Sequence, residues 1–189
     1  FVLSCAVPMF VSLLIMRTML QPEGAINVLL RNVGLIASDA SLPFFTDTTW
    51  ARVTVIIINI WVGVPYTLLQ LTGVLQNIPE ELYEAAKVDG AGTVTRFFRI
   101  TLPMLKPTII LAVFLSITSS LQCFDLIYTM TGGGPNNAST TLVIYAYSLC
   151  FAGSSSAGYA MAVSNILFVV ILVIAMLQRG MMKREASEI

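Results

Sequence analysis

Residues 53–73 read VTVIIINIWVGVPYTLLQLTG, a run without a single charged side chain. A helix needs about 20 mostly apolar residues to cross the hydrocarbon core of a bilayer, and this run is long enough. Uncharged runs of the same character occupy residues 1–16, 107–124 and 159–178. The sequence therefore predicts an all-α polytopic membrane protein, a helical bundle with four transmembrane spans.

The composition of the whole chain agrees with a membrane protein. Of the 189 residues, 57% are hydrophobic and 11% are charged, and the mean hydropathy is +0.85, whereas soluble domains are about one quarter charged. Ten basic residues balance ten acidic ones, so no overall positive field is available to bind nucleic acid. Phe1 falls inside an apolar run, and we expect residues 1–189 to be the C-terminal part of a longer transmembrane domain.

Few residues have the chemistry of a catalytic or metal site. The sequence has no histidine, and its three cysteines, Cys5, Cys123 and Cys150, are scattered. They form no CxxC pair and offer no metal-ligand spacing. The phosphate-binding pattern GxxxxGK[ST] is also absent from the sequence. We expect this chain to hold no catalytic residue, no metal ion and no cofactor.

The distribution of basic residues predicts which loops face the cytoplasm, where Lys and Arg collect in membrane proteins. Seven of the ten lie in residues 74–106 or in the tail after residue 178, and three lie on the opposite side. The 74–106 loop and the C-terminus are therefore predicted to be cytoplasmic. The apolar segment 142–152 is too short to cross, and we expect it to be interfacial or re-entrant.

The predicted cytoplasmic loop carries signals for two short helices. Asn77 is placed to cap the first helix, and Gly90 is placed to end it. The second helix is predicted to begin near Thr93 and to end before Pro103. A short amphipathic helix pair with small residues fits closely into a groove on another protein. The same pattern also suits a hairpin that lies on lipid headgroups.

Polar side chains inside the spans indicate a cavity or a helix contact, because they are costly in lipid. Ser116, Ser119, Ser120 and Cys123 follow the i, i+3, i+4, i+7 spacing of one helix face. Helix packing explains small hydroxyl residues equally well. Aromatic rings beside hydroxyl groups, as at Tyr66, suit a sugar. No charged residue lies inside the four spans, which favours a neutral solute and disfavours ion coupling.

Residues 84–107, EAAKVDGAGTVTRFFRITLPMLKP, resemble the EAA loop of the membrane subunits of binding-protein-dependent ABC importers. That loop has the form EAA, three residues, G, a hydrophobic stretch and LP. All of its anchors are present, namely Glu84, Ala85, Ala86, Gly90, Leu102 and Pro103. Four further segments resemble the carbohydrate group of this family, and in particular its maltose-type permease: GAINVLL (24–30), FFTD (44–47), WVGVPY (61–66) and GGGP (132–135). The resemblance implies the fold of the type I ABC importer permeases.

The resemblance also implies two sets of functional residues. In the family the EAA loop forms coupling helices that dock on a cytoplasmic ATPase subunit, and the matching residues here are Glu84, Ala85, Ala86, Asp89, Gly90 and Ala91. The sugar-contacting positions of the family fall on Gly63, Tyr66, Ser116, Ser119, Ser120 and Cys123. Ser119, Ser120 and Cys123 are smaller than their maltose-type counterparts, which suggests a roomier pocket and leaves the sugar undetermined.

A transport subunit with no catalysis of its own is the function that the resemblance implies. It would move a neutral, maltose-like sugar or oligosaccharide across the bacterial cytoplasmic (inner) membrane by alternating access. The implied partners are cytoplasmic ATPase subunits that bind ATP and Mg²⁺, a second homologous permease, an extracytoplasmic solute-binding protein and membrane lipid. The alternatives are a permease for another polar solute, such as glycerol phosphate, and a structural membrane subunit that does not transport.

Overall fold

The computed structural model describes residues 7–152 and 156–186, and this part of the chain is helical, without a β-strand. The helices in chain order are α2 (Met9–Met19), α3 (Ala25–Asn32), α4 (Thr48–Leu75), α5 (Glu80–Val88), α6 (Thr93–Arg96), the π-helical turn η1 (Phe97–Thr101), α7 (Leu102–Leu121), α8 (Asp125–Met130), α9 (Leu142–Phe151) and α10 (Ala157–Ala186). The prediction of an all-α chain is confirmed.

Three helices in the described residues are long and apolar enough to cross a membrane: Thr48–Leu75, Thr93–Leu121 and Ala157–Met182. They confirm three of the four predicted spans. The run at residues 1–16 overlaps α2, which has 11 residues and is too short to cross by itself. Residues 1–6 lie outside the described part, so the fourth span stays a prediction. The segment 142–152 forms the short apolar helix α9, in agreement with its predicted length.

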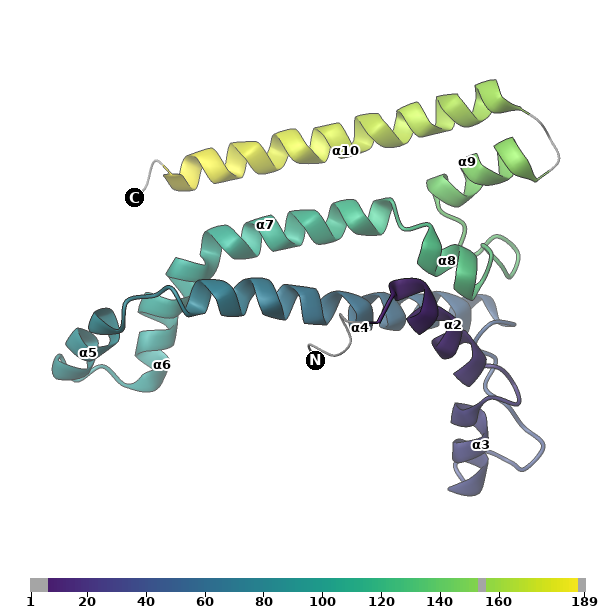
Figure 1. The fold of residues 1–189 in the computed structure, drawn as a ribbon, viewed down its shortest axis with the longest axis horizontal. Helices are drawn as coiled ribbons and strands as arrows, with labels where there is room; N and C mark the ends of the chain where they lie inside the picture. The colour runs from purple at the N-terminus through teal and green to yellow at the C-terminus, as the bar shows by residue number, and fades with distance from the viewer. Residues whose placement is uncertain (1–6, 153–155, 187–189) are drawn as a thin grey trace.

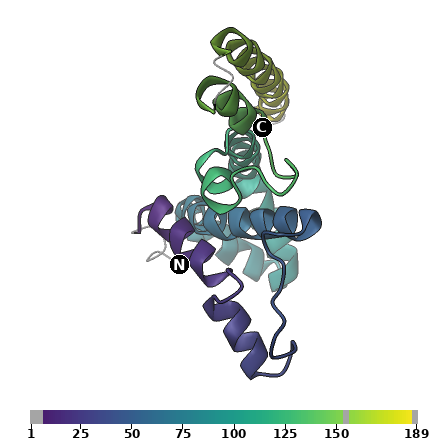
Figure 2. The same ribbon diagram turned by 90° about the vertical axis from the view of Figure 1, so that its right-hand side faces the viewer.

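The three long helices run alongside one another, and α7 lies between α4 and α10 and contacts both (Figure 1). Figure 2, in which the end that carries α2 and α9 faces the viewer, shows the same order and shows α3 projecting away from the long helices. At one end lie α5, α6 and the C-terminal end of α10. The opposite end carries α2, α3, α8 and α9. The loop 74–106 and the C-terminal end of α10 thus lie at the same end of the molecule. That this end faces the cytoplasm stays a prediction.

The hydrophobic core of the chain lies at the end away from α5. Its buried members are Leu13, Leu20, Ile58, Leu126, Ile127, Met130 and Ile144. Here α2 packs against α8, and Arg17 Nη1 donates a hydrogen bond of 2.9 Å to the carbonyl of Thr129. Because the last carbonyls of a helix lack partners within it, this bond ties α2 to the C-terminal turn of α8.

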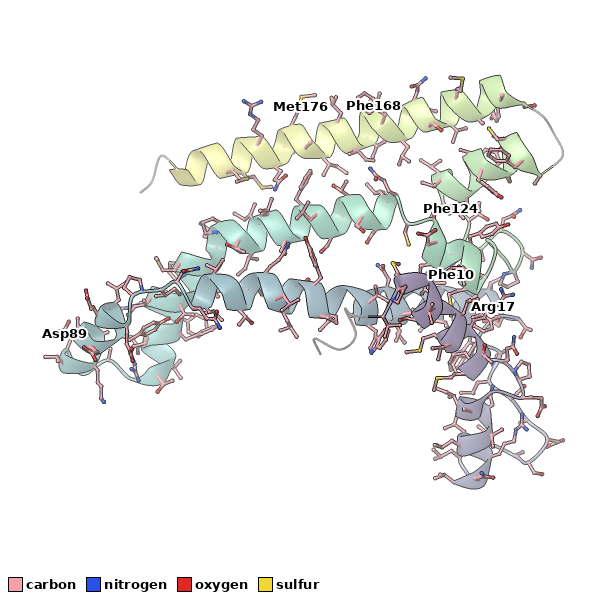
Figure 3. The ribbon with its side chains drawn as sticks, viewed as in Figure 1. Phe10, Arg17, Asp89, Phe124, Phe168 and Met176 are labelled. Atoms are coloured by element: carbon pink, nitrogen blue, oxygen red, sulfur yellow. The ribbon has the colours of Figure 1, made fainter. Side chains whose placement is uncertain are left out.

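Most of the apolar surface of the long helices is not buried within this chain. In the most apolar stretches of the three candidate spans, 17%, 11% and 17% of the residues are buried. On α10, Phe168 and Met176 are 62% and 59% exposed (Figure 3). Surface of this kind is stable only against lipid or another apolar protein face.

The segment around α3 is held together by a buried amide. Asn27 is fully buried; its Nδ2 donates to the carbonyl of Gln21, and its Oδ1 accepts from the N–H of Leu42, both at 2.9 Å. Gly24, just before α3, has no room for a side chain, since a Cβ there would lie 2.3 Å from the carbonyl oxygen of Met19. The GAINVLL segment is therefore fixed by packing and backbone hydrogen bonds.

The prediction that Asn77 caps the first loop helix is wrong. The residue at the N-cap of α5 is Pro79, and Asn77 Nδ2 instead donates to the carbonyl of Gly73 at 2.8 Å. The reason is that Asn77 lies in the turn directly after α4, where the last carbonyls of that helix need donors. Its amide therefore closes the preceding helix.

The second loop helix does not end before Pro103, as the sequence predicted. It continues without a break from Thr93 to Leu121, through Pro103 and Pro107. Immediately before Pro103 the backbone widens into the π turn η1, where the N–H of Leu102 donates to the carbonyl of Phe97. A proline removes a helical donor and crowds the preceding turn, and a wider turn relieves this crowding.

We predict that Asn27→Ala lowers the stability of the α3 segment. The substitution removes two hydrogen bonds, to the carbonyl of the exposed Gln21 and from the N–H of the half-buried Leu42, each worth about 0.5–1.5 kcal/mol. Thermal unfolding of the chain in detergent, followed by the fluorescence of Trp50, whose ring lies 5.7 Å from that of Phe44, should show a lower midpoint. The matched control is Asn32→Ala, an exposed position on the same helix. Equal midpoints for the two variants would contradict the proposed role of the buried amide.

Candidate functional site

A cavity of about 600 Å³ lies between α4 and α7. Its lining residues on α4 are Asn59, Ile60, Gly63, Val64, Tyr66, Thr67 and Gln70. Its lining residues on α7 are Ala112, Leu115, Ser116, Ser119 and Ser120. Five of the six residues predicted to contact substrate thus lie together around one cavity, and their role in binding stays a prediction.

Local sequence explains why α4 leaves space at this place. Gly63 has no side chain, and a Cβ added to it would meet nothing within 4 Å. Pro65 lies inside the helix and lacks the N–H that would normally bond to the carbonyl of Trp61. The hydroxyl of Thr67 donates to the carbonyl of Gly63 at 3.1 Å. A ligand in the cavity would therefore meet backbone as well as side chains.

The two walls are joined by one hydrogen bond between side chains. Asn59 Nδ2 donates to Ser120 Oγ at 3.3 Å. Asn59, Gly63, Tyr66 and Gln70 follow i, i+4, i+7, i+11 spacing, so one face of α4 carries them into the cavity. The predicted site residues omitted Asn59, Thr67 and Gln70, although this spacing was available in the sequence as a signal for Asn59 and Gln70.

The lining combines apolar and polar side chains and carries no charge. Hydroxyl groups come from three serines, Thr67 and Tyr66, amides come from Asn59 and Gln70, and no acidic or basic side chain contributes. Hydroxyl and amide groups both donate and accept hydrogen bonds, and the tyrosine ring adds an apolar face. Such a cavity is suited to a neutral, hydroxyl-rich molecule. Among the described residues, no group of three Cys, Asp or Glu side chains could hold a metal ion.

Cys123, the sixth predicted substrate residue, does not line this cavity. The helix α7 ends at Leu121, so the spacing from Ser116 no longer places residue 123 on the same face. The backbone turns there, with the N–H of Cys123 donating to the carbonyl of Ser120 at 3.3 Å, and the side chain packs against the hydrophobic core. The structure thus separates Cys123 from the other five.

The predicted coupling residues gather at the C-terminal end of α5. Glu84, Ala85, Asp89 and Gly90 are exposed, and Ala86 and Ala91 are half-buried. Asp89 lies at the far end of this region, away from the long helices (Figure 3). The surface that they form is available to another protein, and its role in coupling stays a prediction.

The turn after α5 requires glycine at position 90. Gly90 has φ +77°, a left-handed conformation that glycine adopts without steric cost. Its N–H donates to the carbonyl of Lys87 at 3.1 Å, and the N–H of Ala91 donates to the carbonyl of Ala86 at 2.9 Å. This pair of bonds is a Schellman motif. The prediction that Gly90 ends the helix is confirmed.

The loop is connected to the cavity by covalent continuity and by one hydrogen bond. The hydroxyl groups of Tyr83 on α5 and Thr101 in η1 lie 2.9 Å apart. From η1 the same helix runs on to Ser116 and Ser120 in the cavity wall. The contact between these hydroxyl groups and the continuous helix therefore link α5 to the helix that forms one side of the cavity.

Comparisons with known proteins agree on one family. Residues 1–183 match the family described as binding-protein-dependent transport system inner membrane component. The lactose transport system permease protein LacF of Rhizobium radiobacter is 35% identical over 178 residues, which are 93% of this chain and 59% of LacF. The maltose/maltodextrin transport system permease protein MalF of Vibrio parahaemolyticus is 36% identical over 187 residues, covering 93% of this chain and 35% of MalF.

A solved structure supports the fold. It is the crystal structure of a bacterial alginate ABC transporter in complex with an alginate pentasaccharide-bound periplasmic protein. The TM-score is 0.79 at 29% sequence identity, and the match covers 93% of this chain and 60% of the other chain. The present chain thus spans between about one third and three fifths of the proteins that it matches. It has the fold of an ABC importer permease.

We predict that residues of the cavity wall are in contact with water. In a variant with Cys5, Cys123 and Cys150 replaced by alanine, Ser119→Cys should react with a charged maleimide about tenfold faster than Val113→Cys, because a thiol ionises only where water reaches it. Val113 is a half-exposed residue of α7 outside the cavity lining. The reaction rates are measured on the purified complex by gel shift. Equal rates would show that the cavity is closed to water.

Proposed function

We propose a function from one premise: the chain belongs to the binding-protein-dependent transport system inner membrane component family. The proposed role is that of a permease subunit of an ATP-driven ABC importer. It moves a neutral sugar or oligosaccharide, of which a maltose-like sugar is one example, across the bacterial cytoplasmic membrane. The subunit has no catalytic activity of its own, and ATP with Mg²⁺ is bound and hydrolysed by partner ATPase subunits.

The uncharged, hydroxyl-rich cavity between α4 and α7 is the observation that carries this proposal. Its volume of about 600 Å³ falls in the range of about 300–1,000 Å³ found for small-molecule sites. The names of LacF and MalF refer to the neutral sugars lactose and maltose, whereas alginate is an acidic polysaccharide. The absence of a basic side chain from the lining favours the neutral class for this chain.

Coupling to ATP hydrolysis is proposed to begin at α5. The ATPase docks on Glu84, Ala85, Ala86, Asp89, Gly90 and Ala91. When the ATPase subunits close on ATP, they displace α5, and the bond between Tyr83 and Thr101 passes the displacement to η1 and α7. The wall formed by α7 then moves relative to α4, and the cavity changes its side of access.

The other proposed partners account for the remaining exposed surfaces. A second homologous permease and membrane lipid cover the apolar faces of α4, α7 and α10, of which only small parts are buried in this chain. A solute-binding protein delivers sugar at the end that carries α3 and α9. The loop 74–106 and the C-terminus are then cytoplasmic.

Two alternatives are separated by specific features. A permease for glycerol phosphate requires a positive charge to bind the phosphate, and the cavity lining has none. A structural subunit that does not transport has no need of a connection between a docking loop and a polar cavity. Stimulation of ATP hydrolysis by a neutral sugar, in the complex with its binding protein, distinguishes the proposed function from both.

We predict that Gly90→Asp uncouples ATP hydrolysis from transport while the subunit stays in the membrane. A side chain at Gly90 meets nothing within 4 Å and so points into the space where the ATPase docks. A residue other than glycine in this left-handed conformation costs roughly 1–2 kcal/mol. Gly90→Ala has the same strain without bulk or charge and should keep most of the coupling. Sugar taken up per ATP hydrolysed, in proteoliposomes, is the measurement, and normal transport by Gly90→Asp would refute the docking surface.

We predict that Tyr66→Ala weakens sugar binding. Loss of the ring and its hydroxyl should raise the half-saturating sugar concentration for stimulated ATP hydrolysis about tenfold, which corresponds to about 1.4 kcal/mol. Tyr66→Phe keeps the ring, so its half-saturating sugar concentration should lie between those of the unmodified protein and Tyr66→Ala. Trp61→Ala, an aromatic position of α4 outside the cavity lining, is the matched control. An unchanged half-saturating concentration in Tyr66→Ala would exclude this cavity as the sugar site.

A further inference from the structure

A second hollow, of about 470 Å³, lies within the coupling loop. One wall is the end of α5 and the turn after it, with Ala86, Asp89, Gly90, Ala91 and Gly92. The other wall is α6 and η1, with Thr95, Arg96, Arg99 and Ile100. The two walls have different chemistry, because the first is mostly small residues and the second presents two guanidinium groups.

Arg96 is an incompletely satisfied cation. Its Nε is buried and has no hydrogen-bond partner, and its Nη2 is 3.4 Å from the hydroxyl of Thr93. A buried donor without a partner is destabilising, and more so when it belongs to a charged group. Such a group is stabilised when an acceptor reaches it.

Neither arginine of the hollow is neutralised within the described part of the chain. The ion pair between Arg31 and Glu23 lies beside α3, at the other end of the molecule. Asp89 lines the same hollow but makes no ion pair with Arg96 or Arg99. The hollow therefore has an excess of positive charge and room for an anionic group.

We propose that an Asp or Glu side chain of the partner ATPase subunit enters this hollow and binds Arg96 and Arg99. A carboxylate suits guanidinium groups because it accepts two parallel hydrogen bonds. The inference rests on the proposed function, since Ala86, Gly90 and Ala91 belong both to this hollow and to the proposed docking surface. A protein seated on that surface closes the hollow, and its side chains are the ones in reach.

Through this contact the ATPase would bind the transmembrane helix directly. Arg96 and Arg99 belong to the continuous helix Thr93–Leu121, whereas the EAA residues belong to α5. A carboxylate bound between the two walls would pull both elements together. Arg96 and Arg99 are then specificity-determining residues for the ATPase, beyond the EAA residues.

Charge reversal tests the proposal in the assembled complex. With the full-length permease and its partners in nanodiscs, Arg96→Glu and Arg99→Glu should each lower the ATPase retained per permease about tenfold, because truncation or reversal of one partner of a buried charge pair is costly. Arg96→Lys keeps the charge and should retain more ATPase than Arg96→Glu. The matched control is Arg179→Glu, an exposed arginine of α10 outside the hollow.

A photo-crosslinker in place of Thr95, which lines the hollow, identifies the group that enters it. The expected product joins this chain to an ATPase peptide that contains Asp or Glu. Crosslinks only to lipid, or only within this chain, would overturn the proposal. So would an effect of Arg96→Glu that appears in nanodiscs with phosphatidylglycerol and vanishes in phosphatidylcholine alone, because the anion would then be a lipid headgroup.

Two controls separate this inference from the proposed function. If the unmodified complex retains no ATPase, the proposed function itself fails. If the unmodified complex retains ATPase, and Arg96→Glu and Arg99→Glu retain as much as Arg179→Glu, the proposed function stands and the carboxylate site is refuted. Permease recovered from the membrane is measured for every variant, so that a loss of folding is not counted as a loss of docking.

Discussion

A helix in the hydrocarbon core of a bilayer has to satisfy its own backbone hydrogen bonds, and the arrangement from α4 to α10 depends on this constraint. Pro65, Pro103 and Pro107 each remove a donor, yet α4 and the helix Thr93–Leu121 continue through them. The π turn η1 makes this possible at the entrance of α7. Because the helix is unbroken, the turn that carries Arg96 and the serines of the cavity wall belong to one element.

The cavity between α4 and α7 results from small side chains facing each other rather than from a gap between domains. Gly63 on one helix and three serines on the other leave the volume open, and the serines supply the hydrogen-bonding groups of the α7 wall. The two helices remain joined by the bond between Asn59 and Ser120. This bond lies at the edge of a packed contact between α4 and α7, so the walls of the cavity are held by side-chain packing as well as by hydrogen bonding.

The sequence predicted those features that depend on composition or on one residue. Charge-free runs located three of the long helices, and the single glycine after α5 located its end, because only glycine adopts φ +77° without penalty. A periodic pattern of side chains does not show where a helix ends, so the sequence did not predict features that depend on a helix end. Cys123 was assigned to a face of α7 that ends two residues earlier, and Asn77 was assigned to the next helix although the carbonyl of Gly73 is its partner. The helix continues through Pro103 because of the π turn η1, and the spacing of hydrophobic residues does not predict such a turn.

The exposed apolar faces of the long helices have a consequence for the life of the subunit in the cell. With at most 17% of each apolar stretch buried among the described residues, most of this apolar surface has to be covered by lipid or by further protein. A copy whose long helices stay uncovered exposes large apolar side chains such as Phe168 and Met176, and exposed apolar patches of this kind promote aggregation.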